Sequence, residues 1–149
     1  MIVKILKIAA MTLLLSGLFS CAANKEETIP FVTIGSGQCG IWPKQEIIIT
    51  SQEEWENFIL PLPKSEIDRF SETEINFEEF QIIAAIDDIR PDSGWSMAIT
   101  CIMEYSYFIV VTITVFADIN GVSLSEERRP YYIVKIPASM KRIDFNIKH

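Results

Sequence analysis

Apolar residues follow two patterns along the chain, and both are typical of β-strands. Residues 95–104 alternate large apolar side chains with small or polar ones, which predicts a strand with one buried face, and Cys101 lies on that face. Residues 80–86 and 107–117 are apolar at nearly every position. The longer run is apolar on both faces and is therefore expected at the centre of a sheet. Shorter runs predict further strands at residues 29–34, 45–50, 131–136 and 143–147.

One segment has the period of a helix instead. Ser51 and Glu54 match a capping box, in which the serine side chain accepts at the helix start and the glutamate reaches back. Trp55 and Phe58 follow at helical spacing, so one short helix near residues 52–60 is expected to lay an aromatic face on the core. Together with six or seven strands, this pattern predicts a mainly β (α+β) fold, an antiparallel twisted sheet rolled over its core.

The start of the chain has the layout of a bacterial lipoprotein signal peptide. Lys4 and Lys7 precede an apolar run that is short for a membrane span. Residues 18–21, Leu-Phe-Ser-Cys, match a lipoprotein cleavage box. We therefore expect residues 1–20 to be removed and Cys21 to carry a diacylglycerol. The alternative is an uncleaved N-terminal anchor helix.

Behind the signal, the sequence predicts a short tether and one folded unit. Residues 21–28 contain no large apolar side chain and predict the tether, whereas residues 29–149 are long enough for a single β-rich domain with a core of its own. Ala22 is not the aspartate associated with retention at the inner membrane. The expected location is the cell envelope, lipid-anchored at the outer membrane of a Gram-negative bacterium, on its periplasmic or its surface-exposed side.

The charge balance excludes one class of partner. The chain has 20 Asp and Glu against 13 Lys and Arg, a formal charge of −7. Proteins that bind nucleic acid need basic patches to displace counterions, so no nucleic-acid partner is expected. The same balance disfavours charge-driven adsorption to anionic lipid, and the covalent anchor is expected to hold the protein at the membrane.

Two cysteines remain besides Cys21. Cys39 and Cys101 are in no CxxC arrangement, which predicts neither a zinc site nor a thioredoxin-like motif. In an oxidising compartment, a structural disulfide between them is the preferred expectation. The alternative is two separate thiols, with Cys101 acting as a small buried apolar residue.

Little in the sequence points to catalysis. The single histidine is the last residue, His149, so the common serine and cysteine nucleophiles would lack their usual base. Asp87, Asp88 and Asp92 lie around a loop and are candidate calcium ligands. Their spacing matches no EF-hand loop, however, and clustered acidic residues are typical of turns. We expect a non-catalytic protein with no metal and no cofactor.

Residues 89–95 are the candidate binding loop. Arg90 and Trp95 are residue types that dominate binding hot spots, and Pro91 and Gly94 would fix the loop between two strands. Trp42 lies in another loop and could share a surface with it. The alternative is an ordinary turn, in which Trp95 packs inward and Arg90 pairs with an acid. The candidate binding residues are Arg90, Pro91, Asp92, Gly94, Trp95 and Trp42.

Several motifs occur in an order that resembles a known family. They are Ile34-Gly35-Ser36-Gly37, Ile47-Ile48-Ile49-Thr50-Ser51 ahead of Glu54-Trp55, Ile75-Asn76-Phe77, Arg90-Pro91 with Gly94-Trp95, and residues 129–137. With this set, the chain resembles the C-terminal domain of the protease complex subunit PrcB family of bacterial lipoproteins over residues 31 to 146. Asp92 and Ser93 depart from the family's Thr-Gly at those positions.

The resemblance implies a non-catalytic lipoprotein that binds and stabilises a surface protease complex. The expected function is therefore a membrane-tethered module that binds another envelope protein, with a protease as the implied partner. One alternative is a peptidase inhibitor, because a Gly-aromatic loop at a sheet end could plug an active-site cleft. The other is a hydrolase that uses carboxylates or a lysine.

Overall fold

The computed structural model describes residues 25–118 and 127–149. The expected signal peptide and the lipidation site Cys21 lie outside these residues. Two helices and eight strands follow one another along the described chain. In order they are β1 (Glu27–Thr28), β2 (Val32–Gln38), β3 (Gln45–Ile49), α2 (Gln52–Ile59), α3 (Lys64–Ile67), β4 (Phe80–Ile86), β5 (Trp95–Glu104), β6 (Phe108–Ala117), β7 (Pro130–Pro137) and β8 (Arg142–Lys148).

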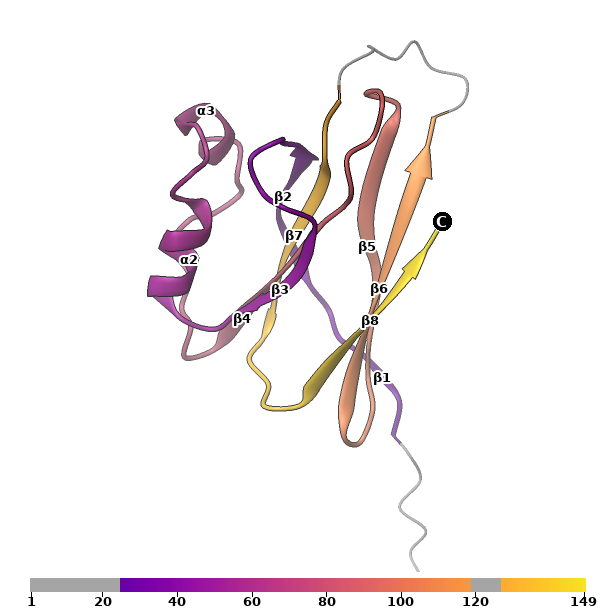
Figure 1. The fold of residues 1–149 in the computed structure, drawn as a ribbon. Helices are drawn as coiled ribbons and strands as arrows, with labels where there is room; N and C mark the ends of the chain where they lie inside the picture. The colour runs from indigo at the N-terminus through magenta and orange to yellow at the C-terminus, as the bar shows by residue number, and fades with distance from the viewer. Residues whose placement is uncertain (1–24, 119–126) are drawn as a thin grey trace, which may run out of the picture.

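The strands form two four-stranded sheets that pack against each other. One sheet has the order β1-β5-β6-β8 and the other β2-β7-β4-β3. Both helices lie on the outer side of the second sheet, so the molecule has three layers: helices, sheet and sheet (Figure 1). The mainly β expectation is confirmed.

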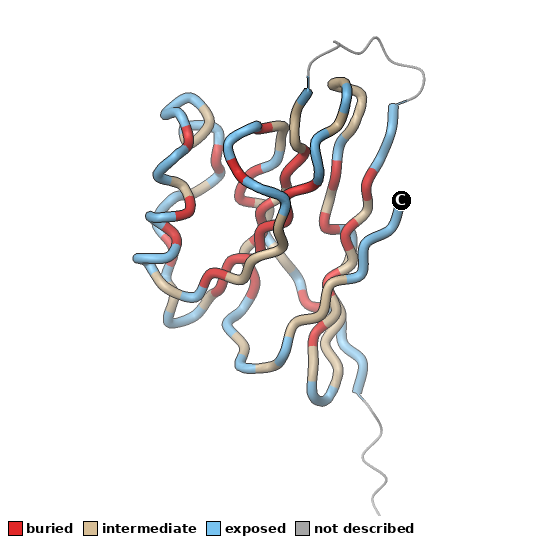
Figure 2. Tube along the Cα trace, in the orientation of Figure 1, coloured by how far each residue is buried: buried red, intermediate tan, exposed pale blue. Residues whose placement is uncertain are grey.

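Two apolar cores hold these layers together, and the sheet in the middle contributes to both. Along β4, Ile82, Ala84 and Ile86 belong to the core beneath the helices, whereas Ile83 and Ala85 belong to the core between the sheets. A strand that is buried on both faces must be apolar at successive positions, which explains the unbroken apolar run at residues 82–86. Figure 2 shows buried residues concentrated along the strands and exposed ones along the outer side of the helices.

The helix predicted near residues 52–60 is confirmed as α2. Its start is capped as the sequence indicates, because Ser51 Oγ accepts from the backbone N–H of Glu54 at 3.2 Å. The Glu54 carboxylate reaches one residue further back and accepts from the N–H of Thr50 at 2.8 Å. Trp55 and Phe58 are the buried residues of the helix. The cap and the aromatic face therefore both follow from the local sequence.

Four finer expectations about the fold are wrong. The structure has two packed sheets rather than one rolled sheet, and it has eight strands rather than six or seven. A second short helix, α3, follows the first. β8 pairs with β6 in parallel, so the sheets are not wholly antiparallel. β6 has the expected inner position in its sheet, but only one of its faces is buried.

The expected disulfide is also wrong: Cys39 and Cys101 are both free cysteines. A bulge in β5 explains this, because the pairing with β6 shifts between Ile99 and Cys101. Ile99 and Ile102 both point into the core between the sheets, so the two residues between them lie on the outer face. The predicted alternation therefore holds as far as Ile99, and the bulge reverses it from Cys101 to the end of the strand. Cys39 belongs to the core beneath the helices, on the far side of the other sheet.

The two thiols should differ in reactivity. Cys39 is 8% exposed and buried, whereas Cys101 is half-buried on an outer face. We expect a maleimide to modify Cys101 in the native protein within the time that leaves Cys39 unmodified, because access limits the reaction. Mass spectrometry of the peptides after native labelling measures this. Denaturation before labelling is the control and should expose both thiols, whereas a bridged pair would contradict the structure.

Candidate functional site

The predicted binding loop begins with an ion pair that is largely buried. Arg90 Nε donates to Asp87 Oδ2 at 2.7 Å, where the side chains are 19% and 6% exposed. The Arg90 guanidinium also lies 4.4 Å from the centre of the Trp95 ring, as a cation–π contact. The backbone of Arg90 forms a bridge with that of Arg128. Arg90 therefore joins three segments of the chain.

The rest of the loop is held by its own hydrogen bonds. Asp92 Oδ1 accepts from the backbone N–H of Gly94 at 2.8 Å, as in an Asx turn. Gln38 Nε2 donates to the carbonyl oxygens of Ser93 and Trp95. Trp95 packs partly buried against the core between the sheets. These contacts match the alternative of an ordinary turn, in which Trp95 packs inward and Arg90 pairs with an acid.

The structure places Trp42 away from this loop, in the core beneath the helices. Trp42 is 4% exposed, and its Nε1 donates to the carbonyl oxygen of Phe58 at 2.9 Å. Its ring stacks on Phe58 with centroids 4.5 Å apart and meets the edge of Tyr131. A residue buried in this way presents no surface to a partner, so Trp42 does not extend the binding loop.

The three candidate calcium ligands, all aspartates, each interact with a different group of the protein. Asp87 pairs with Arg90, and Asp92 accepts from a backbone N–H of its own loop. Asp88 lies 3.7 Å from Lys44 and 3.6 Å from Arg129. The backbone N–H of Ile89, followed by these cations, lowers the pKa of Asp88. Within residues 25–118 and 127–149, no group of three or more His, Cys, Asp or Glu is placed to hold a metal ion.

A different surface stands out, on the sheet that the helices do not cover. We call it the open face and define it by the outward side chains of β5 and β6. None of these residues is buried and none is charged. They are Ser96, Ala98, Thr100, Cys101, Met103, Phe108, Val110, Thr112, Thr114 and Phe116.

The pairing of strands arranges the open face in rows. Met103 stands beside Val110, and Cys101 stands beside Thr112, so apolar and small polar side chains share the surface. The hydroxyl groups of Thr100 and Thr114 lie 3.1 Å apart. Charged residues appear at the rim, where Arg142, Asp144 and Lys148 of β8 extend three of the rows. The sequence did not reveal this face, because the bulge at residues 99–101 decides which side chains lie on it.

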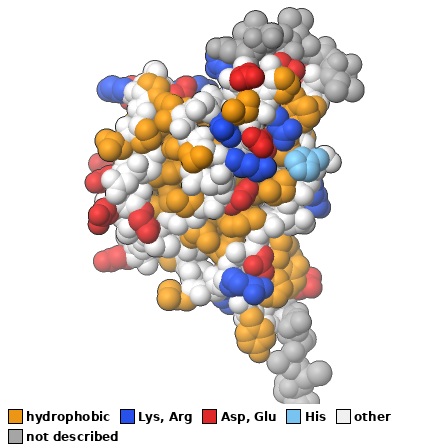
Figure 3. All heavy atoms as spheres, viewed as in Figure 1, with side chains coloured by type: hydrophobic (Ala, Val, Ile, Leu, Met, Phe, Trp, Pro, Cys, Tyr) orange, Lys and Arg blue, Asp and Glu red, His pale blue; other side chains and the backbone are white. Residues whose placement is uncertain are grey.

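The rest of the molecule is more acidic. Figure 3 shows acidic side chains along the helical layer, while hydrophobic side chains gather over the middle of the viewed face. With 20 acidic against 13 basic residues in the whole chain, an uncharged face of two ten-residue strands is a distinct feature. Uncharged, partly apolar patches of this kind mark sites of contact with other proteins.

In the described part of the chain, no helix is long and apolar enough to cross a membrane. No family model, curated protein or solved structure matches the chain.

Proposed function

We propose that the chain is a non-catalytic, membrane-tethered module that binds another envelope protein through its open face. The observation that supports this most is the ten-residue uncharged surface of β5 and β6 on an acidic protein. Depletion of charge at the centre of a patch distinguishes protein interfaces from the rest of a surface. The paired threonine hydroxyl groups supply hydrogen-bonding capacity within that patch.

The size of the open face suits this role. Strands lie about 4.8 Å apart and rise about 3.3 Å per residue, so the two ten-residue strands β5 and β6 present roughly 320 Å². A standard protein interface buries about 800 Å² on each partner. The open face therefore supplies the uncharged centre of such an interface, and the charged side chains of β8 and other neighbouring residues would form its rim.

A protease complex is the partner that the PrcB resemblance implies. In this role the module stabilises the assembly and takes no part in the chemistry. The peptidase-inhibitor alternative required the residue 89–95 loop to enter a cleft. That loop is instead tied down by Asp87, Gln38 and its own backbone, which favours binding through the open face.

The proposal predicts that Thr112→Lys abolishes most partner capture while the fold survives. Thr112 lies on the inner strand β6, between Cys101 and Asn146 in neighbouring strands, so a lysine there places a charge at the centre of the open face. Burying a polar group without a partner costs about 1–3 kcal/mol, and a charge costs more, so we expect at least about a tenfold loss of captured protein. The measurement is capture from detergent-solubilised envelope, with the melting temperature recorded on the same preparation.

Ser65→Lys is the matched control, because it adds the same charge to an exposed serine of α3 on the opposite layer. Equal capture by the two variants would contradict binding through the open face. If the captured protein is a peptidase, its activity with and without the module separates the two roles. Unchanged or longer-lived activity fits a stabiliser, and lost activity fits an inhibitor.

A further inference from the structure

Three segments that are distant in the sequence meet at one end of the molecule, which we call the tether end. Glu27 of β1 pairs with Glu104 at the end of β5. The turn that follows is closed by a hydrogen bond from the Tyr105 N–H to the Phe108 carbonyl oxygen. From the β7–β8 loop, Lys141 Nζ donates to the Tyr105 carbonyl oxygen at 2.8 Å. Figure 1 shows these segments together at the lower end, where the described chain begins.

Two large side chains project from the tether end into solvent. Tyr107 is 84% exposed at the tip of the β5–β6 turn, and Met140 is 103% exposed in the β7–β8 loop. They are the most exposed large apolar side chains of the described residues. Tyrosine and methionine in such positions gain free energy when a partner covers them, and tyrosine in particular suits a boundary between an apolar and an aqueous phase.

The charges at this end are close to balanced. Residues 25–28, 104–108 and 138–144 contain four acids and three bases, which is a net charge of −1 and similar per residue to the −7 of the whole chain. The acids are Glu26, Glu27, Glu104 and Asp144, and the bases are Lys25, Lys141 and Arg142. A contact of this end with a membrane therefore cannot rest on its net charge and must come from its exposed side chains.

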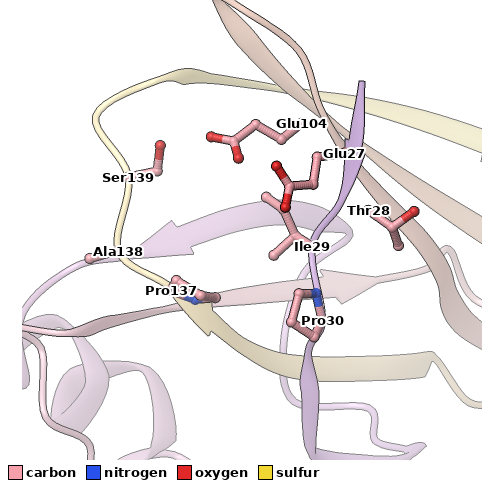
Figure 4. Close-up of a pocket in the computed structure, with 8 residues that line it drawn as sticks. All are labelled: Glu27, Thr28, Ile29, Pro30, Glu104, Pro137, Ala138 and Ser139. Carbon is pink, nitrogen blue, oxygen red and sulfur yellow. The ribbon is translucent and has the colours of Figure 1, made fainter. Parts of the chain in front are cut away.

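A shallow pocket at this end combines acidic and apolar side chains. It has a volume of about 280 Å³ and lies between β1, Glu104 and the start of the β7–β8 loop. Figure 4 shows the carboxylates of Glu27 and Glu104 on its rim, above the apolar side chains of Ile29, Pro30 and Pro137. Glu104 is paired with Lys141 at 2.9 Å. A contact with lipid would therefore rest on the apolar side chains rather than on a basic patch.

The chain that precedes β1 limits how far this end can move from a membrane. Five residues separate Cys21 from Glu27, and at about 3.5 Å per residue the connection spans at most about 20 Å. A lipid on Cys21 would keep the tether end within that distance of the bilayer surface. Tyr107 and Met140 are thus the large exposed side chains at the end that the anchor holds nearest to lipid.

We propose that the tether end docks on the bilayer, with Tyr107 and Met140 inserted at the level of the lipid headgroups. This inference rests on the lipid anchor of the proposed function. Burying one large apolar side chain favours the docked orientation about tenfold or more over orientations that leave it in water. Strands β5 and β6 then rise from the membrane, and the open face is turned toward neighbouring envelope proteins.

Site-specific photo-crosslinking in the full-length chain tests the docking. The chain is expressed in a Gram-negative host with p-benzoylphenylalanine replacing Tyr107, Met140 or, as the control, Leu60. Leu60 is 77% exposed but lies at the end of α2, in the helical layer. After illumination, we expect phospholipid adducts at positions 107 and 140 at about ten times the yield at position 60.

The outcomes separate the docking from the anchor. Flotation with lipid and the mass of the Cys21 peptide report the anchor in the same samples. A chain that floats but gives equal adduct yields at positions 107, 140 and 60 would overturn the docking and leave the anchor intact. Adducts to protein instead of lipid at positions 107 and 140 would identify this end as a second protein interface. That result would also overturn the docking on the bilayer. A chain that does not float would refute the anchor and the docking together.

Discussion

Replacing Cys21 with serine should abolish the proposed lipid anchor. The thiol of Cys21 is the group of the cleavage box expected to carry the diacylglycerol. The variant should therefore be released as soluble protein or accumulate as unprocessed precursor. An acyl chain contributes about 0.8 kcal/mol for each buried CH₂ group, and losing the whole anchor leaves the acidic domain no equivalent attachment. Carbonate washing of membranes, followed by the mass of the retained and released chains, measures this.

Cys101→Ser is the control for this experiment, because it removes a half-buried thiol of the folded domain and leaves residue 21 unchanged. Its retention should equal that of the natural sequence. A Cys21→Ser variant retained as strongly as the natural chain, together with a natural chain of unprocessed mass, would show an N-terminal anchor helix instead of a lipid. The folded domain and its open face would be unaffected by that outcome.

The parts of the fold that the sequence predicted well depend on neighbours along the chain. The helix at residues 52–59 follows from a serine cap and from aromatic residues at helical spacing. The strand at residues 80–86 follows from a run in which residues 82–86 are all apolar, and such a run needs apolar surroundings on both faces. In both cases the local sequence and the final packing favour the same structure, which is why pattern reading succeeds.

The parts that the sequence did not predict depend on contacts between distant segments. Nothing in the local composition around Thr100 signals a bulge, because the extra residue is defined only against the partner strand β6. One unrecognised bulge reversed the face assigned to Cys101 and made the disulfide expectation wrong. The parallel pairing of β8 with β6 likewise depends on where the chain returns after β7.

The candidate site shows the same division. The sequence singled out Arg90 and Trp95, and the structure does bring their side chains together, as a cation–π pair. The sequence also suggests Trp42 as part of this surface, because its Gly-Ile-Trp-Pro setting resembles a surface loop. In the structure, Phe58 and Tyr131 enclose the Trp42 ring. The open face could not be predicted from the sequence, because its residues come from two strands whose relative register the sequence does not reveal.

Arg90→Ala should lower the stability of the domain by about 2–3 kcal/mol, an effect of structure rather than of binding. The change leaves the carboxylate of Asp87, which is 6% exposed, without its cation, and it removes the contact with Trp95. Breaking a fully buried pair costs about 3–5 kcal/mol, and the 19% exposure of the Arg90 side chain places this pair at or below the lower end. For a domain of this size the melting temperature should fall by about 10 °C.

Arg142→Ala is the matched control, because Arg142 makes an ion pair of the same 2.7 Å length with Asp144 while its side chain is 73% exposed. Exposed pairs contribute 0–1 kcal/mol, so this variant should melt close to the natural protein. Adding Asp87→Asn to Arg90→Ala should restore part of the loss, since no buried charge is then left unpaired. If Arg90→Ala melts like the control while partner capture falls, Arg90 belongs to the binding surface, and the ion pair with Asp87 contributes little to the fold.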